Sequence, residues 1–249
     1  MVLIAHVSDL HVDNTERSVE RTRAVFSYLE ALPADLDLVL VTGDIADHGL
    51  DAEYQTVREL IRSRHPVAIC PGNHDDRTAL RRSLLGVEAT TGPVNQVVRP
   101  AGFVGALCDS SIPGKDEGFI DDETLSWLEE VLADTPDDVP VLVGFHHPPV
   151  PLHAAVDPIR QFGEDRLAAV ISRHRNVAGL VCGHAHTAAS TRFAGLPLLV
   201  APGVVSTLRL PWEAPGPSTG LVFLDQPPAL AFHVLDDEWR ITTHFRNVI

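Results

Sequence analysis

The strongest constraint on the fold is an order of residues that recurs along the chain. A short apolar run is followed by glycine or a small polar residue, then by Asp, Asn or His, and then by a polar stretch that opens an amphipathic segment. The apolar runs cover residues 2–7, 36–41, 66–69, 139–145 and 177–182. Such runs, bounded by turn residues, are typical of strands buried on both faces, as in sheets covered by helices. We therefore expect an α/β fold.

Segments with helical spacing of apolar residues separate these runs. They cover residues 15–32, 51–64, 122–133 and 165–174, with a shorter helix at 78–85 that ends at Gly86. Asp121 or Asp122 is the expected N-cap of helix 122–133, because a carboxylate there accepts free backbone N–H groups of the first turn. Beyond residue 190 the strand-like segments 191–200, 220–224, 229–235 and 239–245 follow one another without long helices. They predict a second, more antiparallel sheet.

Nothing in the sequence divides the chain into parts. Its 249 residues are 45% hydrophobic, enough for one sizeable core, and we find no internal repeat and no low-complexity linker. One domain spanning residues 1–249 is therefore expected. The run at 2–7 has no basic leader before it, and no apolar stretch approaches the roughly 20 residues needed to span a bilayer. The default expectation is a cytoplasmic protein without a membrane segment.

The cysteines and the net charge argue against a thiolate metal site and against a nucleic-acid substrate. Cys70, Cys108 and Cys182 lie far apart, each inside or at the end of an apolar run, so we expect buried thiols rather than metal ligands. The formal charge of -15 would repel a nucleic-acid backbone, and no cluster of Lys and Arg offsets it. A small substrate is therefore favoured over a nucleic-acid polymer, although bound metal ions can reverse the local field.

Candidate metal ligands follow the apolar runs. Asp9 and His11 are two residues apart, and alternation along an extended segment would point both side chains to one side. His184 and His186 repeat this spacing. Further donors that follow a run are Asp44, Asn73 and His146, and the carboxyl ends of strands are where open α/β sheets bind ligands. Oxygen and imidazole donors without thiolate suit Mn²⁺, Fe or Zn²⁺. Seven further histidines are not candidate ligands and are expected to be surface or hydrogen-bonded core residues: His6, His48, His65, His153, His174, His233 and His244.

Five motifs in this order resemble those of the calcineurin-like metallophosphoesterases. They are Asp-x-His at Asp9, Gly-Asp at Asp44, Gly-Asn-His-Asp at Asn73, His-His-Pro-Pro at His146 and Gly-His-x-His at His184, and they span about 70% of the chain. The sequences around Asn73 and His184 resemble most the bacterial class III cyclic-nucleotide phosphodiesterases. The resemblance implies a four-layer αββα sandwich, in which two mixed sheets pack face to face with helices outside.

The resemblance also implies a role for each residue of the motifs. Asp9, His11 and His186 would bind one metal ion, Asn73, His146 and His184 would bind the other, and Asp44 would bridge both. Two such ions can clamp a phosphoryl group and activate a bridging hydroxide, which would attack phosphorus in line. His74 would assist the leaving group, and His147 would support a ligand or face the substrate. Activity should fall at acid pH, because ligand imidazoles must be neutral to bind metal.

Small phosphodiesters are the expected substrates, with 3′,5′-cyclic nucleotides first among them. The alternatives are a glycerophosphodiesterase, a broad-specificity phosphoesterase and, less favoured, a nuclease of the same superfamily. A non-enzymatic scaffold of this fold is a distant alternative, since one retromer subunit keeps the fold without the full metal site, whereas here the set is complete. Small phosphodiesterases of this kind are often dimeric or larger, so a homodimer is compatible with the resemblance. Specificity is expected in the loops 110–118, 148–158 and 204–217.

Overall fold

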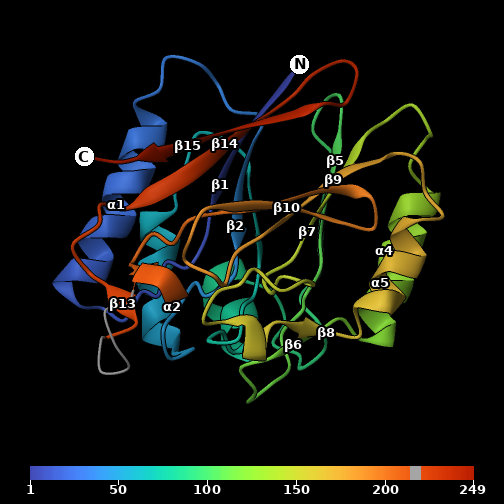
Figure 1. Cartoon of the computed structure of the whole chain (residues 1–249). Coiled ribbons are helices and arrows are strands. Elements are labelled where there is room, and N and C mark those ends of the chain that lie inside the picture. The colour runs from blue at the N-terminus through green and yellow to red at the C-terminus, as the bar shows by residue number, and fades with distance from the viewer. Residues whose placement is uncertain (214–219) are drawn as a thin grey trace.

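Two mixed β-sheets lie face to face at the centre of the molecule, with helices on their outer faces (Figure 1). The computed structural model describes residues 1–213 and 220–249. The five-stranded sheet has the order β15-β14-β1-β2-β3, with bounds Ile241–Asn247, Ala229–Leu235, Val2–Val7, Leu38–Thr42 and Val67–Cys70. The six-stranded sheet has the order β10-β11-β9-β7-β5-β4, with bounds Ala189–Phe193, Leu196–Val200, Val177–Cys182, Val141–Gly144, Val104–Leu107 and Gln96–Val98. The predicted fold class is confirmed.

The helices lie on opposite sides of this sandwich. In Figure 1, α1 (Glu16–Glu30) and α2 (Asp51–Leu60) lie beyond the five-stranded sheet, and α4 (Asp122–Ala133) and α5 (Glu164–Ile171) beyond the six-stranded one. The remaining short elements are α3 (Arg77–Ala79), which continues into a π-helical turn at Leu80–Leu85, and the paired strands β6 (Gly118–Phe119) with β8 (Gln161–Phe162) and β12 (Thr207–Leu208) with β13 (Val222–Phe223). Single 3₁₀ turns cover Asp157–Ile159 and Pro211–Glu213.

Side chains cap the starts of α1 and α4, and the cap of α4 is Asp121, one of the two residues expected there. The Thr15 side chain accepts a hydrogen bond from the backbone of Ser18 at the start of α1, and Asp121 accepts one from Thr124 at the start of α4. Each satisfies an N–H that the first helical turn leaves free. Gly86 takes a left-handed conformation (φ 67°) after the π-helical turn, which ends that segment where the sequence predicts.

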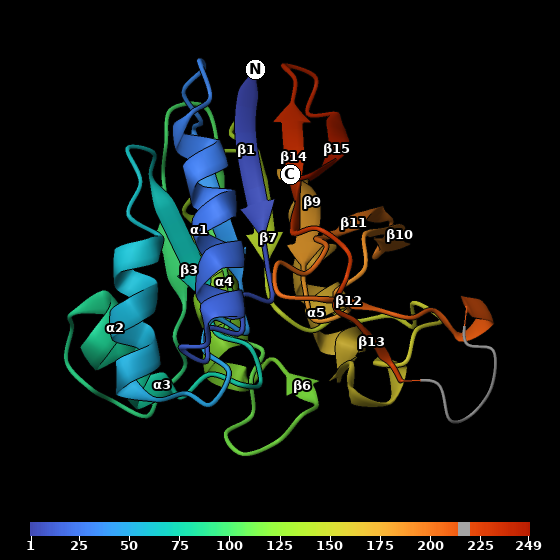
Figure 2. The ribbon, with the colours of Figure 1, turned by 90° about the vertical axis from the view of Figure 1, so that its left-hand side faces the viewer.

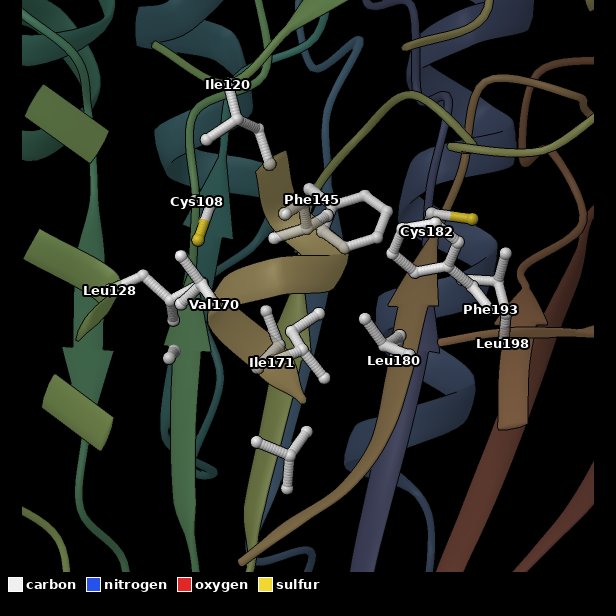
Figure 3. Close-up of a cluster of buried hydrophobic side chains, with 14 of the residues drawn as sticks. Cys108, Ile120, Leu128, Phe145, Val170, Ile171, Leu180, Cys182, Phe193 and Leu198 are labelled. Carbon is white, nitrogen blue, oxygen red and sulfur yellow. The ribbon is translucent and has the colours of Figure 1, made fainter. Parts of the chain in front are cut away.

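Three apolar clusters hold the layers together. One lies between the five-stranded sheet and its helices, and includes Phe26 and Tyr54. Another lies between the six-stranded sheet and α4 and α5, where Leu128, Val170 and Ile171 meet Phe145 and Leu180 (Figure 3). The third fills the space between the sheets, with members such as Ile4 and Leu40 from one sheet and Leu142 and Leu199 from the other. Cys70, Cys108 and Cys182 are all buried, as expected.

The prediction that the segments beyond residue 190 form a second, more antiparallel sheet is wrong, because most of them are divided between the two mixed sheets. β14 and β15 instead extend the first sheet beside β1, and β10 and β11 extend the second beside β9. Each pair is antiparallel within itself, so the local pattern was read correctly, but an edge of an existing sheet offers backbone partners that a new sheet would lack. β4 and β5 were missed, because two short runs separated by Pro100 and Gly102 give little periodic signal.

Parallel strands from both sheets end on one side of the molecule. β1, β2 and β3 are parallel in one sheet, and β5, β7, β9 and β11 in the other. The arrows of β1, β7 and β9 point down in Figure 2, toward the loops that carry the predicted ligands. A bridge between Ser8 and Gly203 joins the sheets there. None of the described helices combines the length and the apolar character that crossing a bilayer requires.

Candidate metal centre

Five strand ends deliver the candidate ligands to one place. Asp9 and His11 follow β1, Asp44 follows β2, Asn73 follows β3, His146 follows β7, and His184 and His186 follow β9. The side chains of Asp9, His11, Asp44, His146, His184 and His186 are all buried or nearly so. Because the first three strands belong to one sheet and the last two to the other, the site forms only when the sheets pack together.

The first group of donors comprises Asp9, His11, Asp44 and His186, whose ligand atoms all lie within 4.8 Å of one another. The Nε2 atoms of His11 and His186 face each other at 3.1 Å. His11 Nε2 lies 3.4 Å from Asp44 Oδ2, and His186 Nε2 lies 3.4 Å from Asp9 Oδ1. Around an ion with bonds of about 2.0–2.2 Å, adjacent donors lie about 3.0–3.4 Å apart, so this group fits one ion.

The second group comprises His146, His147 and His184, again within 4.8 Å. His184 Nδ1 lies 3.2 Å from His146 Nε2. Asp44 Oδ2, already close to His11, lies 3.3 Å from His146 Nε2. One carboxylate oxygen therefore faces both groups, as a ligand shared by two ions would.

Hydrogen bonds behind the imidazoles orient the ring nitrogens. His146 Nδ1 donates to the carbonyl oxygen of Thr42 at 2.7 Å, and His11 Nδ1 donates to Asp47 Oδ1 at 2.8 Å. His186 Nδ1 bonds to Ser206 Oγ at 3.0 Å. A proton held at Nδ1 leaves the Nε2 lone pair of His146 and His11 facing the other donors, the usual arrangement for a histidine that binds metal.

Asn73 lies beside Asp44. The Asn73 amide oxygen is buried and has no hydrogen-bond partner among residues 1–213 and 220–249, which leaves an acceptor free for a cation. The loop that carries it is pressed against Asp44, because His74 N–H donates to Asp44 Oδ1 at 3.0 Å and a side chain on Gly72 would collide with the Asp44 carboxylate. Gly43 is required for the same reason, since any Cβ there would collide with the His146 ring.

The backbone at the ligands is left-handed, which corrects one step of the sequence analysis. The φ angles are 55° at Asp9, 41° at His11, 48° at Asp44, 67° at His184 and 52° at His186. Asp9 and His11 are therefore not alternate residues of an extended strand; the loop curls and turns both side chains toward the site. Such conformations are costly for non-glycine residues and cluster at functional sites.

The buried carboxylates attract positive charge. Burial lowers the pKa of His146, but Asp44 outweighs burial and raises it to about 9. Burial likewise opposes ionisation of Asp44, yet the imidazoles of His146 and His11 hold its pKa well below the usual range. Burial and the neighbouring His146 lower the pKa of His184 to about 3. In the metal-free protein, protons on some imidazoles thus supply the charge that bound cations would otherwise supply.

His74 lies at the mouth of the site, and its side chain is 40% exposed. Its Nδ1 donates to the carbonyl oxygen of Asp47 at 2.8 Å, and its ring packs edge-on against that of His11, with 4.5 Å between centroids. This leaves Nε2 as the nitrogen available to a substrate. Asp47 thus holds both His11 and His74, although the sequence analysis overlooked it; its place three residues after Asp44, in the same loop, was the available signal.

His147 is fully buried and close to His146 and His184. Its Nδ1 bonds to Ser110 Oγ at 2.8 Å, and its ring fills the space left by Gly118. Ser110 Oγ also accepts the backbone N–H groups of His146 and His147, so its hydroxyl hydrogen is left to donate to His147 Nδ1. The proton of a neutral His147 is then on Nε2, which makes that nitrogen a donor.

Of the predicted specificity loops, 110–118 borders the site, and 214–217 of the last loop lie outside the described residues. Arg209 stacks on Phe223, with 3.4 Å from its guanidinium carbon to the ring centroid. Trp212, an aromatic side chain that the sequence alone would favour as packed, is 71% exposed. The short 3₁₀ turn that carries it projects from the surface and offers no core position.

Comparison with known proteins places these features in a family. The model of the calcineurin-like phosphoesterases matches residues 2–188. Glycerophosphodiester phosphodiesterase GpdQ of Enterobacter lignolyticus is 31% identical over 96% of this chain and 89% of its own. A probable cyclic nucleotide phosphodiesterase of Rhodococcus erythropolis is 33% identical over 86% of this chain and 74% of its own. A dimetal phosphatase from Danio rerio, 16% identical, aligns with a TM-score of 0.67 over 100% of this chain and 99% of its own, which shows a shared fold.

Proposed function

We propose that this chain, which belongs to the calcineurin-like phosphoesterase family and is a metal-dependent phosphodiesterase, hydrolyses 3′,5′-cyclic nucleotides. The alternative substrates are glycerophosphodiesters. Both are small diesters with one negative charge on phosphorus.

The single observation that carries the two-metal mechanism common to both substrates is the position of Asp44. Its Oδ2 atom lies 3.4 Å from His11 Nε2 and 3.3 Å from His146 Nε2, between the two groups of donors. Asp9, His11 and His186 would hold one ion, Asn73, His146 and His184 the other, and Asp44 both. Mn²⁺, Fe or Zn²⁺ suits these donors. Two bound ions would supply Lewis acidity. Their positive charge would exceed the negative charge of the two carboxylates, Asp9 and Asp44, which favours binding of a phosphodiester anion.

His74 would act on the oxygen that leaves phosphorus. Its Nδ1–H is fixed on the Asp47 carbonyl, so the ring presents Nε2 toward the mouth of the site. In the imidazolium form Nε2–H can donate to the leaving alkoxide and pass it the proton, which neutralises the charge developing on that oxygen. Contact with the His11 ring restricts the orientation of His74.

A cavity of about 270 Å³ adjoins His74 and is suited to the leaving group. Its lining includes Asn73, Asp76, Thr78 and Ser111. Hydroxyl and carboxylate groups there can bond to a hydroxyl-bearing alcohol, which both ribose and glycerol provide. The cavity therefore does not distinguish the two substrates. The preference for cyclic nucleotides rests on the similarity to cyclic nucleotide phosphodiesterases, whereas the match to GpdQ over 96% of the chain favours glycerophosphodiesters.

Turnover by Mn²⁺-loaded protein tests the proposal. 3′,5′-Cyclic AMP, with release of 5′-AMP as readout, is compared with glycerophosphocholine and with bis(p-nitrophenyl) phosphate as a general diester. A higher kcat/KM on cyclic AMP than on glycerophosphocholine would support the proposal, and the reverse order would replace it by the alternative. The Asp44→Asn variant, which removes the shared charge, controls for contaminating esterases.

A further inference from the structure

A chain of hydrogen bonds, buried at its two histidines and half-buried at Thr243, links the C-terminal hairpin β14–β15 to the end of β2. Thr243 Oγ1 on β15 bonds to His233 Nδ1 on β14 at 2.9 Å, and His233 Nε2 bonds to His6 Nδ1 on β1 at 3.0 Å. His6 Nε2 then bonds to Thr42 Oγ1, the last residue of β2, at 2.8 Å. The chain thus crosses all four strands, side chain to side chain.

This chain lies in the space between the two sheets. Along β1, Val2 and Ile4 belong to the cluster between the sheets, and alternation places His6 on the same face. His233 is likewise two residues from Leu235 of that cluster. His6 and His233 are 0% and 1% exposed, and burial lowers the pKa of both, that of His233 to about 3. As neutral rings, each donates one hydrogen bond and accepts one, so all four ring nitrogens are satisfied.

Thr42 connects the chain to the metal centre. Its carbonyl oxygen accepts from His146 Nδ1 at 2.7 Å and from Ser8 Oγ at 2.8 Å. Because Thr42 ends a strand of the five-stranded sheet and His146 follows a strand of the six-stranded one, the His146 bond links the two sheets where the ligands meet. Thr42 also precedes Gly43 and Asp44, whose φ angles of 85° and 48° begin the ligand loop.

We propose that His6 and His233 are positioning residues of the metal centre: through the Thr42 hydroxyl they fix the Thr42 carbonyl that orients His146. The proposal rests on the metal role of His146 in the proposed function. If Thr42 rotates or shifts, the His146 ring loses the acceptor that holds its proton on Nδ1, and Nε2 no longer faces Asp44 and His184. The C-terminal hairpin, which lies outside the matched residues 2–188, thereby becomes part of the ion site.

An apolar pair would be the ordinary choice at this depth. A buried imidazole without partners loses its hydrogen bonds to water and gains none in return, so a buried His–His pair is stable only because its partners are fixed. The histidine pair in turn restrains its partner. The bond to His6 selects one rotamer of Thr42, which packing by apolar side chains alone would not do.

The test is the Mn²⁺ affinity of metal-stripped protein, measured by calorimetric titration together with the melting temperature. Thr42→Val removes only the hydroxyl, and His233→Leu removes the partner of His6. Each should weaken binding of the ion that His146 would hold by about 10-fold, the low end of the 10–100-fold seen for groups that support ligands. Binding of the other ion should change less. Thr42→Ser and His233→Gln keep a hydrogen-bonding atom in place and should stay within about 3-fold of the wild type.

Leu235→Ala is the matched control, because Leu235 is buried two residues from His233 on the same face but takes no part in the chain. It should lower the melting temperature without changing the Mn²⁺ affinity. Unchanged affinity in Thr42→Val and His233→Leu, or an equal loss in Leu235→Ala, would overturn the proposal. A wild-type protein that binds two ions but cleaves no diester would refute the proposed function and leave this proposal intact. One that binds no Mn²⁺ would refute both.

Discussion

The apparent affinity for metal should change with pH up to about pH 9, well above the pH range in which an ordinary histidine titrates. With its pKa raised to about 9 by Asp44, His146 carries a proton in the metal-free protein at neutral pH, and an ion can bind only after that proton leaves. The apparent affinity should therefore be full above pH 9 and fall about tenfold per pH unit below it. At pH 7 the loss is about 100-fold, or about 2.7 kcal/mol. A histidine with a pKa of 6.5 would cost only about 1.3-fold there.

Calorimetric titration of the stripped protein with Mn²⁺ at several pH values between 7 and 9 measures this loss. Repeating it in two buffers of different ionisation enthalpy counts the protons released. We expect release of at least one proton per chain on metal binding at pH 7.5. The pKa of His11 is also raised, because burial lowers it less than Asp44 and the neighbouring carboxylates raise it. His74→Ala, which leaves every proposed ligand in place, should show the same slope. An affinity that is constant from pH 7 to 9 would refute the electrostatic argument.

Four further outcomes are expected. Asp44→Asn should weaken binding of both ions more than about 100-fold and abolish turnover, and two ions per chain by metal analysis would contradict the shared ligand. His74→Ala should retain both ions while kcat falls about 10²–10⁴-fold, and an undiminished kcat would remove His74 from the reaction. Gly183→Ala should destabilise the fold by about 1–3 kcal/mol in urea, since its Cβ would collide with Ser8, and a wild-type midpoint would argue against that contact. Burial lowers the pKa of His233 to about 3, so between about pH 3 and 6.5 the unfolded chain binds a proton that the folded chain does not. The stability present above pH 6.5 should therefore fall by up to about 1.4 kcal/mol per pH unit below it. His233→Gln should reduce this slope in unfolding curves measured at acid pH.

The sequence predicted most of the elements because their signals are local. Runs such as 2–7 and 177–182 coincide with β1 and β9, and helix 122–133 coincides with α4. Strand pairing was not local in this sense. Nothing near residues 229–235 says that they pair with β1, more than 200 residues away, rather than with their sequence neighbours alone.

The identities of the candidate ligands were also local, since each comes shortly after a strand, and all but His11 and His146 directly follow a glycine or another small residue. The five motifs were sufficient to identify the family, and the structure brings their side chains together. The residues that support the ligands were missed. Thr42 acts partly through a backbone carbonyl, which any residue type could supply, and Asp47 and Ser206 are ordinary loop residues until the fold places them behind an imidazole.

The sequence by itself therefore determined which donors are present and that they stand at strand ends. Only the tertiary structure decided that two sheets bring them within ion distance, that Asp44 faces both groups, and that its charge raises the pKa of His146. The physical reason is range. Strand and turn formation depend on neighbouring residues, whereas an electrostatic shift or a selected ring tautomer depends on groups that meet only after the chain has packed.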